Sequence, residues 1–170
     1  MLGLGPQCQS QTTEQQHAAI MKRGDHGMRF SHEKTTHQFI LLKDGGAIQV
    51  GVNDPKDDTS RDHIRMHLSH AAEMFSTGNF NGPMFIHDTT PLGVPTMTKL
   101  HSETHYQCQQ TDSGAKIMIA TANPKALQAV HDFLRFQIGE HKTGDPTEVR
   151  NDNGDRTGDL HQPGGTVRQQ

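Results

Sequence analysis

The sequence predicts an α+β two-layer sandwich, in which two long helices cover one face of an antiparallel sheet of two β-hairpins. Two pairs of β-prone segments, each joined by a glycine-containing turn, predict the hairpins. Two segments with apolar residues at helical spacing, each preceded by capping residues, predict the helices. Because each element has one apolar face, stacking the helices on the sheet gives a single core.

The chain of 170 residues suits one domain with tails. We expect a flexible arm over residues 1–27, with a short helix from about Thr13 to Arg23. A single α+β domain follows over residues 28–146, and a disordered tail over residues 147–170. The start of the arm is rich in Gln, Ser and Thr, and the tail in Gly, Asp and Arg. Such compositions bury too little apolar surface to hold a fixed structure.

The first hairpin joins residues 36–42 to residues 47–52 across Asp44-Gly45-Gly46. Its register stays open, because two turn lengths fit the sequence. A two-residue turn at Asp44-Gly45 places His37 on the apolar face, and a three-residue loop places Gln38 there. Since a shift of one residue exchanges the two faces, the register decides whether a histidine faces the core.

Caps, turns and periodicity predict the remaining elements. Residues 57–60 offer caps for a long helix that reaches about Ser76. Asn123 and Pro124 begin a second long helix, which reaches about His141. Between these helices we expect a short buried strand over residues 84–87, a short helix over 94–101 and a second hairpin of strands 104–109 and 116–121.

Composition and motifs exclude several classes of function. Lys and Arg number 16 against 19 Asp and Glu, and they form no cluster, which argues against a nucleic-acid groove. No apolar run approaches the length of about 18 residues that a membrane span needs. Cys8 and Cys108 form no CxxC motif; we expect two free thiols, with one disulfide between them as the alternative. The segment His32–His37 is one residue too long for the HExxH motif of metalloproteases.

Histidine is the unusual residue of this chain, with 13 copies. The first long helix has an apolar stripe, Ile64, Leu68, Ala71 and Phe75. Three histidines and a methionine form a row with the same spacing, each one position before a residue of the stripe. Imidazoles three or four residues apart on a helix can share one ion, and a thioether beside them suits Cu(I) or another soft metal. A solvated, histidine-rich helix flank is the alternative. The row is His63, His67, His70 and Met74, with His67 nearest the apolar stripe.

Histidines outside this row could complete a site. His37 lies on the first hairpin, and His87 precedes an aspartate at the end of the expected short strand. His131 and His141 lie close to the centre of the apolar stripe of the last helix. An imidazole that faces a core must find a hydrogen-bond partner, a proton or a metal ion. We therefore add His37, His87 and His131 to the candidate metal ligands.

Two aromatic residues of the last helix lie away from its apolar stripe. Phe133 and Phe136 point elsewhere, with Phe136 almost opposite the stripe. Their position predicts burial either against another element of the chain or in a homo-oligomer contact with a second subunit.

Six blocks of the sequence resemble a group of small exported bacterial proteins of unknown function. The blocks are RGDHGM (23–28), TTHQF (35–39), DGG (44–46), the helix 64–75, PMFIHD (83–88) and FLRFQIGEHKTGD (133–145). The resemblance covers roughly residues 23–150 and implies a periplasmic or extracellular location. Residues 1–6 look like the end of an export signal. The group leads us to expect a histidine at Gln38 and a glycine at Arg29. If a paired-histidine site belongs to the group, the change at Gln38 weakens it here.

Three functions agree with these observations. The leading hypothesis is a soluble extracytoplasmic binding protein for a transition metal, copper or zinc, or for a metal cofactor. The second is a small hydrolytic enzyme with a His-lined pocket, for which the sequence locates no nucleophile. The third is a structural or interaction module whose histidines only tune solubility and pH response. The candidate metal ligands are His63, His67, His70, Met74, His37, His87 and His131.

Overall fold

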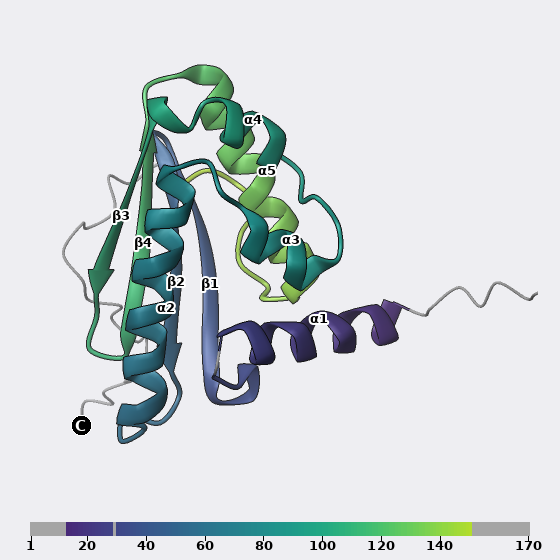
Figure 1. Cartoon of the computed structure of the whole chain (residues 1–170), viewed down its shortest axis with the longest axis vertical. Coiled ribbons are helices and arrows are strands. Elements are labelled where there is room, and N and C mark those ends of the chain that lie inside the picture. Colours follow the sequence, from purple (N-terminus) through teal and green to yellow (C-terminus); the bar gives the residue numbers. More distant parts are fainter. Residues whose placement is uncertain (1–12, 29, 151–170) are drawn as a thin grey trace, which may run out of the picture.

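A computed structural model describes residues 13–28 and 30–150 (Figure 1). Residues 1–12 of the expected arm, including Cys8, and the tail beyond Arg150 lie outside the described residues. The helices are α1 (Thr13–Met28), α2 (Asp58–Ser76), α3 (Asn81–His87), α4 (Val94–Lys99) and α5 (Pro124–His141). The strands are β1 (Thr35–Leu42), β2 (Gly45–Val52), β3 (Thr104–Gln110) and β4 (Gly114–Thr121).

The four strands form one antiparallel sheet in the order β1-β2-β4-β3. The two expected hairpins are therefore present, and their inner strands pair with each other. Helices α2 and α5 pack on the same face of this sheet, with α2 over β3 and β4 and α5 over β1 and β2 (Figure 1). The expected α+β two-layer sandwich is confirmed.

The register of the first hairpin is fixed by a two-residue turn at Lys43-Asp44. Leu42 pairs with Gly45, and His37 pairs with Val50. The turn thus begins one residue earlier than either expected turn, because Gly45 joins the strand. The turn still contains two residues, as in the first alternative, so His37 lies on the apolar face of the sheet.

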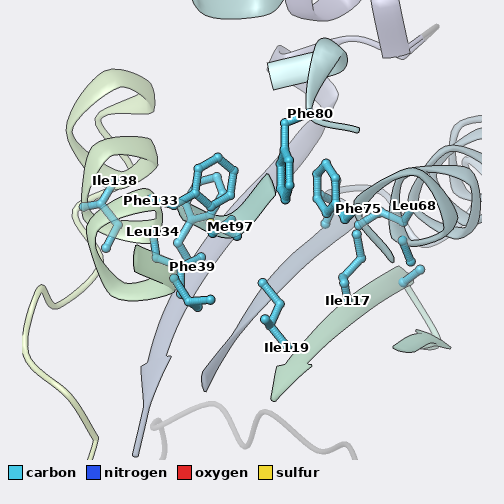
Figure 2. Close-up of a cluster of buried hydrophobic side chains, with 14 of the residues drawn as sticks. Phe39, Leu68, Phe75, Phe80, Met97, Ile117, Ile119, Phe133, Leu134 and Ile138 are labelled. Atoms are coloured by element: carbon cyan, nitrogen blue, oxygen red, sulfur yellow. The ribbon is translucent and has the colours of Figure 1, made fainter. Parts of the chain in front are cut away.

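The core lies between the sheet and the two long helices (Figure 2). Phe133 of α5 is only 1% exposed, and its ring meets Phe75 of α2 and Phe80 edge to face. Phe133 is therefore buried against other elements of its own chain, which is the first of the two predicted alternatives. The core residues of α2 are Ile64, Leu68, Ala72 and Phe75.

The segment before α4 differs from the expectation. Residues 81–87 form helix α3 and not a short buried strand. The side chain of Asn79 accepts the N–H of Asn81 at 3.0 Å and so satisfies a free donor at the start of the helix. Pro83 has no N–H to give to a strand ladder but is well tolerated in the first turn of a helix. The apolar run is too short for its pattern to separate the two structures.

Both ends of the domain extend further than expected. α1 continues as far as Met28, and Ile20 and Met28 are buried. At the other end, the N–H of Arg150 donates to the carbonyl of Leu41 at 3.0 Å, so residues 147–150 belong to the structure and not to a tail. This hydrogen bond satisfies a carbonyl on the outer edge of β1. Among the described residues, no helix has both the length and the apolarity to cross a membrane.

Candidate functional site

A cavity of about 130 Å³, here called the inner cavity, lies among α2, α3, α5 and the strands β1 and β2. The polar side chains of its lining are five histidines and one glutamine, and the remaining lining residues are apolar, two methionines among them. The histidines and methionines are His37, His67, His70, His87, His141, Met28 and Met74. The inner cavity therefore gathers neutral nitrogen and sulfur donors in an apolar setting.

Local structure explains how these side chains reach the inner cavity. Helical periodicity places His67, His70 and Met74 along one side of α2. His87 and His141 are each the last residue of a helix, α3 and α5. The residue that follows each of them is left-handed, with φ of 53° and 51°. A left-handed residue other than glycine costs free energy and is often found beside functional sites.

The ring of His141 lies between the rings of two other histidines. It stacks on His37 with a centroid separation of 5.8 Å and an interplanar angle of 6°. It meets His87 edge to face at 5.1 Å. Phe30 lies against both His37 and His67, at 6.2 Å and 5.9 Å. Imidazoles from β1, α3 and α5 thus form one contiguous group, and a phenyl ring links it to α2.

Two ring nitrogens of this group are buried without a hydrogen-bond partner among the described residues: Nε2 of His37 and Nδ1 of His87. The other nitrogen of His87, Nε2, donates to Oε1 of Gln137 at 2.9 Å, which leaves Nδ1 with a lone pair in the neutral ring. That Nδ1 lies 3.9 Å from Oε2 of Glu140. Buried polar atoms almost always have a partner, so these two nitrogens are the ones in the group that are available to a ligand.

Four histidines of the inner cavity, His37, His67, His87 and His141, have lowered pKa values. Burial, followed by the charge of His67, lowers the pKa of His37 to about 4. Burial, followed by the charges of His37 and His87, lowers the pKa of His141 to about 3. Burial also lowers the pKa of His67 and of His87, in the second case against the raising effect of Gln137 and Glu140. At neutral pH these rings are unprotonated, which is the form that binds metal ions.

The structure brings five of the seven candidate ligands to the inner cavity. Sequence reasoning placed His141 on the core side of α5 but did not include it among the ligands. It missed Met28, since nothing in the local sequence ties the end of α1 to this cavity. His63 does not line the inner cavity, although it belongs to the same row on α2. The five are His37, His67, His70, Met74 and His87.

His131 is also outside the inner cavity and has a structural role. Its Nε2–H donates to the carbonyls of Leu42 and Gly45 at 2.8 Å and 3.0 Å. These carbonyls lie on either side of the turn between β1 and β2. His131 does not line the inner cavity, so the structure does not bring it together with the other candidate ligands.

We expect His131→Ala to lower the free energy of unfolding by about 1–3 kcal/mol, because two buried carbonyls lose their donor. Urea unfolding at pH 7 measures the change. The variant should keep the ligand binding of the unmodified chain, since His131 does not line the inner cavity. A variant as stable as the unmodified chain would show that water replaces the lost donor.

Within the part of the chain that the structure describes, no three His, Cys, Asp or Glu side chains are arranged to hold a metal ion. Comparison with known proteins finds no protein-family model, curated protein or solved structure that matches this chain. The function must therefore be argued from the chemistry and geometry of the inner cavity.

Proposed function

We propose that this protein binds a soft transition-metal ion, Cu(I), in the inner cavity. One observation carries the proposal: Nε2 of His37 and Nδ1 of His87 are both buried without a partner among the described residues, and the ring of His141 contacts both residues. The resemblance to small exported bacterial proteins supports a periplasmic or extracellular location for this binding.

The donor set favours copper over zinc. Zinc sites are usually tetrahedral and combine imidazole with thiolate or carboxylate ligands. The described residues that line the inner cavity offer imidazoles and the thioethers of Met28 and Met74, with no thiolate or carboxylate. Thioether sulfur selects Cu(I), and imidazole binds copper well.

The same geometry favours ligand binding over acid–base catalysis. A general base works best when its pKa lies near the working pH. The pKa values of about 4 for His37 and about 3 for His141 make both rings weak proton acceptors at pH 7. A ring that resists protonation still has its lone pair for a metal ion, so the hydrolytic alternative has the weaker support.

The proposal is tested by titrating the full chain with Cu(I) under anaerobic conditions, against a chromogenic Cu(I) chelator as competitor. We expect one ion per chain, and a higher Tm of the loaded protein, because a ligand that binds only the folded state stabilises it. His37→Ala and His87→Ala should each weaken binding by about tenfold or more, which corresponds to the loss of about 1.4 kcal/mol. Met74→Leu should weaken binding of Cu(I) through loss of the thioether.

The matched control is His105→Ala, which removes an exposed histidine of β3 that does not line the inner cavity. It should bind Cu(I) as the unmodified chain does. Equal losses in His105→Ala and His87→Ala would indicate diffuse adsorption to histidines and would overturn the proposed site. Failure of the unmodified chain to compete with the chelator would overturn the function itself.

A further inference from the structure

A second cavity, of about 270 Å³ and here called the outer cavity, lies among α1, β1 and the end of α5. Four histidines and two methionines belong to its lining, a donor set of the same kind as that of the inner cavity. They are His17, His32, His37, His141, Met21 and Met28. The described residues therefore form a second histidine-lined cavity beside the inner cavity.

Two histidines of the outer cavity have rings fixed by hydrogen bonds. Nδ1 of His17 donates to the carbonyl of Glu140 at 3.0 Å. Nδ1 of His32 lies 3.0 Å from each carboxylate oxygen of Asp25, which also accepts the N–H of His32 at 2.7 Å. Each pairing places the ring proton on Nδ1 and leaves the Nε2 lone pair of the neutral ring. Histidines that bind metals almost always make such a second hydrogen bond to a carbonyl or carboxylate.

The two cavities share three lining residues, His37, His141 and Met28. The boundary between the cavities thus contains donor side chains. Exposure falls along this direction, from 35% for the side chain of His32 to 1% for that of His87. The three shared residues are thus the donor side chains at which the two cavities adjoin.

We propose that the outer cavity is the entry site for the metal ion, where His17 and His32 bind Cu(I) before His37, His141 and Met28 pass it to the inner cavity. The inference rests on the proposed function. Each step exchanges one nitrogen or sulfur donor for another, and the ion stays Cu(I). The ion must stay coordinated at each step, because an ion that enters an apolar interior without ligands loses its hydration and gains no contacts in return.

The experiment measures how fast the full chain takes Cu(I) from a weak chelator, by stopped flow, and how tightly it holds the ion at equilibrium. The double variant His17→Gln and His32→Gln should load about tenfold more slowly or worse, within the range over which association rates vary among variants. Its equilibrium affinity should stay within about twofold of the unmodified chain, because neither residue lines the inner cavity.

Asp25→Asn provides a second variant that leaves both histidines in place. It removes the charge that orients His32 and should also slow loading. His26→Gln, which changes an exposed histidine of α1 outside both cavities, is the matched control and should load at the unmodified rate. Circular dichroism checks that each variant is folded.

The outcomes separate the two proposals. Unchanged loading rates in the double variant, with normal affinity, would overturn the entry site and leave the inner site standing. Slow loading with normal affinity would support the entry site. Absence of Cu(I) binding in the unmodified chain would overturn the proposed function, and the entry site with it.

Discussion

Acidifying the metal-free protein from pH 7 to pH 4 should lower its free energy of unfolding by about 3 kcal/mol through His37 and His141. Both rings are buried, contact each other and are neutral in the folded state. Their folded pKa values of about 4 and about 3 lie below the unperturbed value of 6.5. The two rings titrate as a pair, so their contributions are counted together.

The sign follows from proton binding in the two states. Between pH 6.5 and about pH 3, the unfolded chain binds protons at these histidines more readily than the folded chain. Their contribution to stability is therefore complete above pH 6.5 and is lost progressively as the pH falls through the folded pKa values. Protonation inside the protein would place two charges on stacked rings in an apolar setting, so unfolding relieves it.

Urea unfolding at pH 7, 6, 5 and 4, with a chelator present, measures this loss. In His141→Leu, one of the two titrating rings is absent and His37 no longer has a charged neighbour in α5. We expect the stability of this variant to fall by less than that of the unmodified chain between pH 7 and pH 4. His105→Leu changes an exposed residue, so the stability of this variant should fall with pH as that of the unmodified chain does. This control also accounts for the titration of carboxylates. Parallel curves for all three proteins would contradict the burial of a neutral pair.

Phe133→Ala should lower the free energy of unfolding by about 3–5 kcal/mol, as large-to-small changes of buried aromatic residues do. Phe133 is 1% exposed and contacts the rings of Phe75 and Phe80 at 6.4 Å and 6.1 Å. Phe133 also lines the inner cavity, so its removal enlarges a space that already lacks protein atoms. The cost arises both from the lost burial and from the void that remains.

Thermal and urea unfolding of the metal-free variant test this expectation. Phe85→Ala is the matched control, because Phe85 of α3 is 56% exposed and its removal should change stability by about 0.5 kcal/mol or less. Phe133→Leu should recover part of the loss, since it refills most of the space. A Phe133→Ala protein as stable as the Phe85→Ala protein would show that the core collapses to fill the void.

Capping residues in the sequence predicted where the two long helices begin, because each cap bonds to residues only two or three positions away in the chain. The Asn123 side chain accepts the N–H groups of Lys125 and Ala126, as its place before Pro124 predicts for a helix cap. Asp57 caps α2 in the same way through Ser60. α3 was not predictable, because a short apolar run has no period that separates strand from helix.

The candidate site was only partly predictable. The spacing of His67, His70 and Met74 on α2 follows from helix geometry alone, and the sequence indicated that they share one side. Their meeting with His37 required the hairpin register, and here two turn lengths led to opposite faces. His131 and His141 looked equivalent on α5, yet one bonds the turn carbonyls and the other lies against His37.

The sequence by itself determined the α+β sandwich, the two hairpins, the caps of the long helices and the histidine row of α2, because each depends on interactions between residues close in the chain. Only the tertiary structure decided which histidines meet. His37, His87 and His141 come from β1, α3 and α5, and their contacts exist because these elements pack around one apolar cavity. Packing also removes the rings from water, and this desolvation keeps them neutral and leaves two of their nitrogens without a partner in the part of the chain that the structure describes.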